Sequence, residues 1–251
     1  MSGVFKQFDS YTLRARVFPA LIAGLPTLAM LFFVIPWDRL GISHLIASTM
    51  AIVLLVAFAD VARRAGRNVE TILGTRATPE LWYRTDNAID SISKERYRAF
   101  MGTKLQVSPP TEQDEISNPA QADQFYLSAG FWLRDHTRDT KKFKLLYEEL
   151  LTYGFRRNLL GLKPVALCLN AIVAILCLAA IVSPVELPIH QSIERLTVVI
   201  VAVVLHSAYM IFAVGKQAVR EASRSYGVQL IASCETLLAP PRRSSPNKKS
   251  T

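Results

Sequence analysis

Four stretches of about 20 residues without any Asp, Glu, Lys or Arg constrain this chain more than any other feature. They cover residues 17–36, 40–59, 164–185 and 196–215. An α-helix rises about 1.5 Å per residue, so each stretch reaches roughly 30 Å, the thickness of the hydrocarbon core of a bilayer. The average composition, with 51% apolar and 20% charged residues, would suit a soluble protein, but four such stretches exclude an ordinary one. The sequence predicts an integral membrane protein with four transmembrane helices.

The positions of Lys and Arg predict its orientation. Of the 29 such residues, only Arg39 and Arg195 lie between the paired spans, and the other 27 lie outside both pairs. Cytoplasmic segments of membrane proteins are enriched in Lys and Arg. We therefore expect a multi-pass protein of the bacterial inner (plasma) membrane with both termini in the cytoplasm, where it displays most of its net charge of +9.

The predicted fold class is an all-α membrane protein, in which two transmembrane helical hairpins flank a helical cytosolic domain. The predicted segments are a cytosolic arm (1–16), a first hairpin (17–62), the helical domain (63–163), a second hairpin (164–215), an amphipathic helix (216–238) and a disordered basic tail (239–251). Pro164 is expected to open the third span, and the fourth span is expected to continue as a helix to about Leu238.

Within the helical domain, two prolines are expected at the first position of a helix, each after a capping side chain. These pairs are Thr78-Pro79 and Asn118-Pro119. Apolar residues recur at helical spacing from Ile89 to Leu105 and from Phe125 to Leu133. The segment 107–122, with three prolines and several acids, is expected to be a loop. No stretch alternates regularly enough to predict a strand.

Motifs for catalysis or metal binding are absent from the sequence. There is no G-x-x-x-x-G-K-[ST], G-x-G-x-x-G, H-E-x-x-H or G-x-S-x-G pattern. The three cysteines have no zinc-binding spacing, and the four histidines are scattered. We therefore expect no enzymatic activity and no cofactor.

Two polar residues within the predicted spans are candidates for a functional role. Asn170 lies in the third span and His206 near the middle of the fourth. Polar side chains are costly inside a membrane and need a partner or water. They could line a pore, or they could bond across helices and only fix the packing.

Basic residues of the helical domain form the stronger signal for a ligand. The candidate ligand-binding residues are Arg134, Arg138, Lys141, Lys142, Lys144, Arg156 and Arg157. A second basic cluster contains Lys94, Arg96, Arg98 and Lys104. Aromatic residues lie among them, a combination that suits a nucleotide or a short single-stranded oligonucleotide. The same cations could instead meet anionic lipid or form a solvated face.

An ordered row of cations is expected within the first of these clusters. If residues 134–142 are helical, the i, i+4 spacing places Arg134, Arg138 and Lys142 on one face. Such a row would match the spacing of phosphates along an extended single strand.

Several segments resemble a family of uncharacterised bacterial proteins with four transmembrane helices. They are Tyr11-Thr-Leu-Arg-Ala-Arg-Val-Phe-Pro-Ala20, Ala57-Phe-Ala-Asp-Val-Ala-Arg-Arg64, Asp139-Thr-Lys-Lys-Phe-Lys144 and Tyr153-Gly-Phe-Arg-Arg-Asn-Leu-Leu-Gly161. In layout the chain also resembles the membrane effector of the Hailong antiphage defence system. That resemblance implies an oligomeric, channel-forming effector, gated by DNA oligomers that a partner nucleotidyltransferase makes. No ligand-binding motif of that family carries over residue by residue.

Three functions fit these features. The first is a homo-oligomeric pore that a cytosolic anionic ligand opens, and the second is a membrane-anchored scaffold that conducts nothing. The third is a small transporter, for which an internal repeat would be expected. Four spans enclose little space, so both the pore and the transporter require an oligomer.

Overall fold

The computed structural model describes residues 10–34, 44–76, 78–182 and 193–239. Every regular element in these ranges is helical, and none of the described residues forms a strand, which confirms the all-α class. The predicted outer loops fall largely on residues 35–43 and 183–192, and the predicted tail falls almost entirely on 240–251, so these predictions lie outside the described residues. His190 lies there as well.

The chain divides into two compact units, each built from two separate stretches. Unit 1 combines Met1–Arg76 with Leu150–Ser223, and unit 2 combines Ala77–Glu149 with Arg224–Thr251. The predicted domain 63–163 therefore has its middle in unit 2 and both ends in unit 1. Two long helices, α7 (Lys144–Val182) and α9 (Lys216–Leu238), contribute residues to both units.

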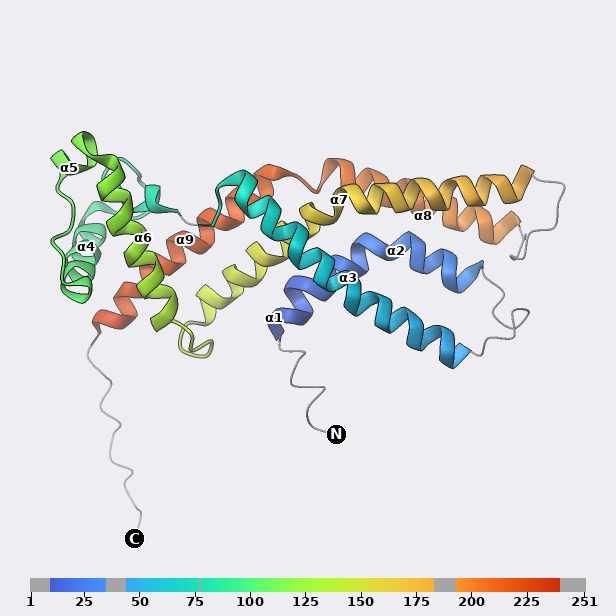
Figure 1. Ribbon diagram of the computed structural model, residues 1–251, viewed down its shortest axis with the longest axis horizontal. Coiled ribbons are helices and arrows are strands. Elements are labelled where there is room, and N and C mark those ends of the chain that lie inside the picture. The colour runs from blue at the N-terminus through green and yellow to red at the C-terminus, as the bar shows by residue number, and fades with distance from the viewer. Residues whose placement is uncertain (1–9, 35–43, 77, 183–192, 240–251) are drawn as a thin grey trace, which may run out of the picture. The chain divides into compact units, whose positions relative to one another are not determined.

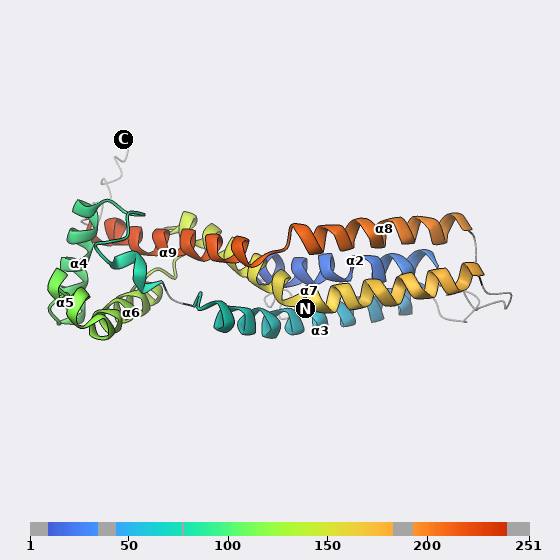
Figure 2. The ribbon, with the colours of Figure 1, turned by 90° about the horizontal axis from the view of Figure 1, so that it is seen from above.

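Unit 1 is a bundle of long helices (Figures 1 and 2). The chain enters it through the short α1 (Ser10–Thr12) and the π-helical η2 (Leu13–Val17), which leads directly into α2 (Phe18–Phe33). The bundle then contains α3 (His44–Leu73), most of α7, α8 (Ile193–Phe212) and the start of α9.

Three helical segments are long and apolar enough to cross a membrane. They are Ser10–Phe32, Lys144–Val182 and Ile193–Phe212. The remaining predicted span, 40–59, falls partly on residues 40–43, outside the described ones, and α3 is not among the three. Four spans therefore stay a prediction, whereas three candidate spans are a property of the structure.

Two helix boundaries differ from those predicted. Pro164 lies inside α7 instead of opening a helix. The fourth span does not continue unbroken, because α8 ends at Phe212 and α9 begins at Lys216. At this break, Lys163 Nζ donates to the carbonyls of Ile211 (3.1 Å) and Val214 (2.8 Å). The cation thus satisfies carbonyls that lose their helical donors.

Small residues bring the helices of unit 1 close together. One cluster of buried apolar side chains joins α2, α3, α7 and the end of α8, and it includes Ala20, Ala62, Leu162 and Met210. A second cluster joins α7 to α8 through residues such as Val173 and Val203, with Val34 beside them. Side chains facing outward from these helices are largely apolar and exposed, as expected of a bundle surrounded by lipid.

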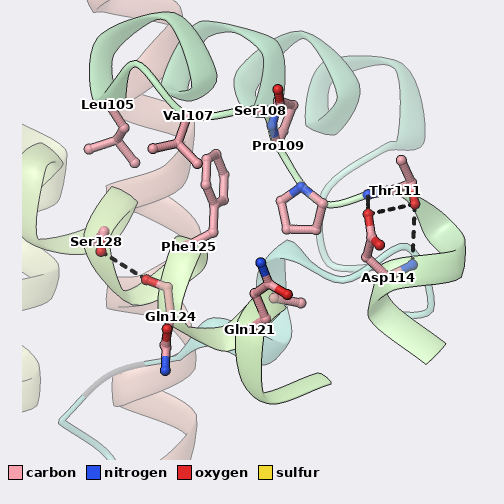
Figure 3. Close-up of a pocket in the computed structure, with 12 residues that line it drawn as sticks. Leu105, Val107, Ser108, Pro109, Thr111, Asp114, Gln121, Gln124, Phe125 and Ser128 are labelled. Atoms are coloured by element: carbon pink, nitrogen blue, oxygen red, sulfur yellow. Dashed lines mark hydrogen bonds between the residues drawn. The ribbon is translucent and has the colours of Figure 1, made fainter. Parts of the chain in front are cut away.

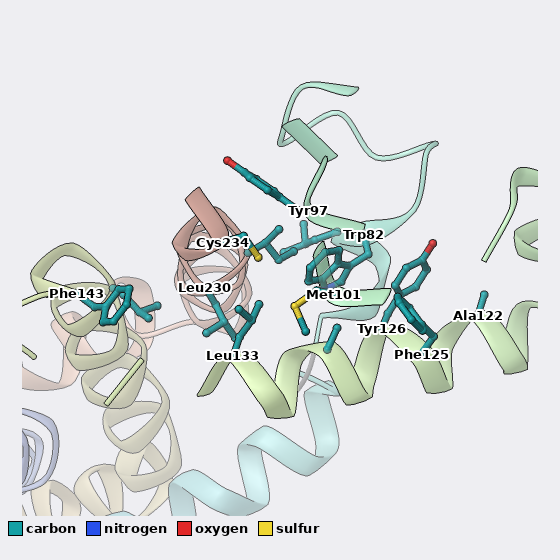
Figure 4. Packing of buried hydrophobic residues seen from close by; sticks show 14 residues of the cluster. Trp82, Tyr97, Met101, Ala122, Phe125, Tyr126, Leu133, Phe143, Leu230 and Cys234 are labelled. Atoms are coloured by element: carbon teal, nitrogen blue, oxygen red, sulfur yellow. The ribbon is translucent and has the colours of Figure 1, made fainter. Parts of the chain in front are cut away.

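Unit 2 is a small helical domain with its own core. It contains η3 (Pro79–Trp82), α4 (Ser91–Leu105), α5 (Glu112–Ser117) and α6 (Pro119–His136), together with the start of α7 and most of α9. Met101, Tyr126 and Leu133 pack with Trp82 and with Cys234 of α9 (Figure 4). The helical periodicity predicted for α4 and α6 is confirmed.

Local capping explains where several of these helices begin. Pro119 is the first residue of α6, and the Asn118 side chain accepts from Gln121 N, as predicted. The parallel prediction for Thr78 is wrong in part, because Pro79 opens only a short 3₁₀ helix and Thr78 makes no capping bond. The segment 107–122 is also more ordered than the predicted loop: a capping box between Thr111 and Asp114 starts α5.

Candidate functional site

Polar side chains of α7 and α8 meet in the interior of unit 1, and we call Asn170, His206 and Ser207 the polar centre. Asn170 Nδ2 donates to Ser207 Oγ at 2.8 Å. The His206 Nδ1 atom lies 3.0 Å from Asn170 Nδ2 and 3.2 Å from Asn170 Oδ1. Asn170 and His206 are only 2% and 7% exposed, so this polar contact is screened from the surroundings by apolar side chains. The structure therefore brings together the two in-span residues that the sequence singled out.

The other ring nitrogen of His206 faces α2. Its Nε2 is buried and makes no hydrogen bond of ordinary geometry, and the backbone of Ile22 is the group near the ring. The carbonyl of Ile22 would normally accept from the residue four positions later, which is Pro26 and has no N–H. The polar centre thus lies where three helices meet, beside a carbonyl that a proline has left without its helical donor.

The chemistry available at the polar centre is hydrogen bonding and proton or ion coordination. A neutral imidazole and an amide offer both donors and acceptors, and the hydroxyl of Ser207 adds one more of each. Within the described parts of the chain, no group of three or more His, Cys, Asp or Glu side chains could hold a metal ion. The polar centre is thus a buried set of hydrogen-bonding groups between apolar helices.

The predicted row of cations on one helical face does not form, and this prediction is wrong. Helix α6 ends at His136, and α7 begins only at Lys144. Thr137 Oγ1 donates to the carbonyl of Leu133, and Asp139 Oδ1 accepts from the backbone N–H groups of Lys141 and Lys142. These side chain to backbone bonds stabilise a turn in place of the helix that would align the cations.

The cations of this segment still lie on the surface, in varied environments. Arg134 lies in the last turn of α6, with its guanidinium 4.7 Å from the centre of the Phe131 ring, which is 54% exposed. Arg138 pairs with Asp135 at 2.5 Å, although both side chains are largely exposed. Lys142 Nζ lies 5.3 Å from the Phe143 ring, and Lys141 is exposed. Aromatic rings thus lie beside Arg134 and Lys142, but Arg134 is half-buried, the Phe143 ring is buried, and the cations have no regular spacing.

The remaining candidate cations form ion pairs or hydrogen bonds with partners in the same chain. Lys144 lies 3.8 Å from Glu148 in the first turn of α7. In unit 1, Arg157 forms a largely buried ion pair with Glu70 of α3 at 2.7 Å, and Arg156 donates to the carbonyl of Ala218 at 3.1 Å. Arg156 and Arg157 therefore join elements of the bundle.

Sequence reasoning missed that part of the second basic cluster is buried in unit 2. Lys94 is 1% exposed, and its Nζ donates to the carbonyls of Tyr83 (2.7 Å) and Asp86 (2.5 Å). Arg98 is 2% exposed and donates to the carbonyl of Trp82 at 2.6 Å. Both cations hold the turn between η3 and α4 in place. No sequence signal distinguishes them from the surface cations nearby.

A charged network completes the interior of unit 2. Glu115 of α5 accepts from Arg84 at 2.7 Å and from the Tyr126 hydroxyl at 2.5 Å. Burial and the bond to Glu115 raise the pKa of Tyr126 well above its usual value, so Tyr126 stays protonated and donates. Near one end of η3, Asp86 pairs with Arg224 of α9 at 2.6 Å. These contacts fix the small domain, and Asp86 also lines an open acidic hollow of about 500 Å³ together with Glu80 and Asp123.

A groove of about 720 Å³ lies on unit 2 between the 105–111 segment and α6 (Figure 3). Phe125 points into it, with Leu105 and Val107 beside the ring, and the polar side chains include Gln121 and Gln124. No Lys or Arg lines it. The groove therefore has no cations to hold an anionic ligand, and the predicted basic residues lie elsewhere.

No known protein family, curated protein or solved structure matches this chain.

Proposed function

We propose that the chain is a multi-pass protein of the bacterial inner membrane that assembles into an oligomer and opens an ion pathway past the polar centre. The observation that carries this proposal is the position of Asn170, His206 and Ser207 inside two helices that are long and apolar enough to cross a membrane. Ionisable and polar groups at such positions commonly mark ion or proton pathways.

The small number of helices supports an oligomer. A single chain offers too few helices to enclose water, so a continuous pathway needs helices from several copies. In the assembled pore, water or an ion would occupy the side of His206 where Nε2 lacks a regular hydrogen bond within the chain. Opening would then require a modest shift of α8 against α2 and α7.

Unit 2 is the proposed sensor. Its surface carries Arg134 over the half-exposed ring of Phe131, with Arg138, Lys141 and Lys142 following along the chain. This arrangement favours an anionic ligand with a stackable base, such as a nucleotide or a short DNA oligomer. In the antiphage setting implied by the resemblance, a partner nucleotidyltransferase would make that ligand.

The test is ion flux through the purified protein in lipid vesicles. We expect flux from the wild type in the presence of a DNA oligomer, and altered flux from His206→Leu and Asn170→Leu. His136→Ala serves as the control, because His136 stacks on Trp132 at the surface of unit 2. Wild-type vesicles that stay tight under all ligands tested would contradict the pore.

The alternative is a membrane-anchored scaffold without conductance. Asn170 finds partners within the chain, and Arg156, Arg157 and Lys163 join parts of unit 1, as expected where polar groups only fix packing. The scaffold predicts tight vesicles together with a monomeric mass in detergent. The pore predicts flux and an oligomeric mass.

A further inference from the structure

Three polar side chains of α7 recur at intervals of seven residues: Arg156, Lys163 and Asn170. Seven residues are close to two turns of an α-helix, so the three lie along one face of α7, with about 10 Å between neighbours. Each donates a hydrogen bond to α8, to the start of α9 or to the break between them. We call this row the polar seam, and the polar centre lies at one end of it.

The polar seam follows the antiparallel packing of α7 on α8 (Figure 1). Asn170 donates to Ser207. Seven residues earlier on α7, Lys163 donates to the carbonyl of Val214, which lies seven residues after Ser207. A further seven residues back on α7, the first residue of the seam donates to the carbonyl of Ala218 in α9. The seam therefore continues past the break between α8 and α9.

The two cations of the polar seam keep their positive charge. Lys163 donates to the carbonyl oxygens of Ile211 and Val214, and Arg156 also donates to a carbonyl. A carbonyl is a dipole and leaves the charge of the cation in place, whereas a carboxylate would neutralise it. Within the described part of the chain, neither cation forms an ion pair. Both residues are half-buried, so part of each side chain stays accessible.

Carboxylates close to the polar seam have other partners or lie far along the helix. Glu70 of α3 pairs with Arg157 at 2.7 Å. Glu221 of α9 is exposed and accepts from Gln217 at 3.0 Å. The one acidic residue of α8 is Glu194, in its first turn, at the opposite end from the break. The seam therefore offers an ion two positive charges and no negative one.

We propose that the ion pathway follows the polar seam and conducts small anions, with Lys163 and Arg156 setting the sign of the ion. This inference rests on the proposed pathway past the polar centre and names the ion that it carries. Lys and Arg along a pathway select anions, because they lower the energy of an anion and raise that of a cation at the same place. Seven residues after Asn170, the same face carries Cys177 among buried apolar side chains, so this part has to widen when the pathway opens.

The test is the reversal potential of the current through the full-length protein in a planar lipid bilayer, with a KCl gradient and a DNA oligomer present. We expect the wild-type current to reverse near the chloride equilibrium potential. Lys163→Gln removes the charge but keeps an amide that can donate to the same carbonyls. It should lower the ratio of chloride to potassium permeability about fivefold, the effect of one unit charge at about 4 Å in water.

Two further variants separate the charge of Lys163 from its role in packing. Lys163→Arg keeps the charge and should keep the wild-type permeability ratio. Lys216→Gln is the matched control, because it removes the same charge from an exposed position just beyond the break and should leave the ratio unchanged. If Lys163→Gln does not fold, Arg156→Gln replaces it with the same expected effect. A purely structural role for Lys163 predicts a lower melting temperature with no change in the ratio.

The outcomes distinguish failure of this inference from failure of the proposed function. A wild-type current that reverses near the potassium equilibrium potential would overturn the anion pathway and leave the pore in place. An unchanged permeability ratio in folded Lys163→Gln and Arg156→Gln would overturn it as well. Bilayers that carry no wild-type current under any ligand tested would contradict the pore itself, and the anion pathway with it.

Discussion

The side-chain amide of Asn158 in α7 occupies the place where a Cβ of residue 66 in α3 would lie. Its Nδ2 donates to the carbonyl of Ala15 at 2.6 Å, so a single amide joins three segments of unit 1. One turn along α7, Gly161 meets the same part of α3. This close approach depends on glycine at both positions 66 and 161.

We expect Gly161→Ala to destabilise the bundle by roughly 1–3 kcal/mol, the usual cost of overpacking. Its Cβ would lie 2.6 Å from the carbonyl carbon of Ala65 and 2.7 Å from Gly66 N, and backbone atoms cannot rotate away. The control is Gly215→Ala, where nothing lies within 4 Å of the new Cβ. Thermal unfolding in detergent measures the difference in stability between the two variants. Equal melting temperatures would contradict the prediction, because they would mean that α3 and α7 can move apart at little cost.

A double-mutant cycle on Asn170→Leu and His206→Leu measures the coupling within the polar centre. We expect an interaction free energy of about 0.6–2 kcal/mol, the range measured for hydrogen bonds between transmembrane helices. Each single variant leaves the partner group unsatisfied, so the double variant should be more stable than the sum of the single effects predicts. Additive effects on unfolding would mean that the two side chains do not bond in the membrane.

Stability of unit 2 should fall at acidic pH through Asp86. Burial alone would raise the pKa of this carboxyl, but the hydrogen bond from Ala88 N and the ion pair with Arg224 outweigh it, and the net pKa lies below the usual value. The ionised form is therefore favoured in the folded state. The ionised Asp86 carboxylate makes its full contribution to the free energy of unfolding above the pKa of the unfolded state, about 3.9. This contribution is lost as the pH falls through the lower pKa of the folded state.

Asp86→Asn should accordingly lower the free energy of unfolding by roughly 1 kcal/mol at pH 7. Below pH 4, the stability of this variant should depend less on pH than that of the wild type. Asp135→Asn is the control, because Asp135 and Arg138 are 64% and 78% exposed and their pair should contribute little. Unfolding is followed by the fluorescence of Trp82 and Trp132 in a Trp37→Phe background. Identical pH profiles for the two variants would contradict a role for the Asp86–Arg224 pair.

Binding of a labelled single-stranded DNA oligomer should weaken steeply with salt if unit 2 is the sensor. Each neutralised phosphate contributes about 0.7 to the log–log slope, so Arg138→Ala/Lys142→Ala should flatten it by about 1.4. Lys216→Ala/Arg220→Ala removes the same charge from exposed positions of α9 and should leave the slope unchanged. The absence of binding at low salt would eliminate the nucleic-acid ligand.

The sequence by itself determined the helical class and the position of the apolar segments. Charge-free stretches and apolar periodicity are local properties of the sequence. Because the hydrogen bonds of a helix are local too, these patterns predicted helices such as α4 and α6 well. The capping of α6 by Asn118 was predicted for the same reason: the cap and the N–H that it accepts from lie three residues apart.

Only the tertiary structure decided which polar groups meet and which cations are available. Asn170 and His206 are 36 residues apart, and their contact depends on how α7 packs on α8. Lys94 and Arg98 look like surface cations in the sequence, yet they are buried because backbone carbonyls of the 82–86 segment accept from them. The end of α6 at His136 depends on a competition between helical bonds and side-chain bonds from Thr137 and Asp139. Helical periodicity carries no information about these outcomes, because each depends on the free energy of particular contacts.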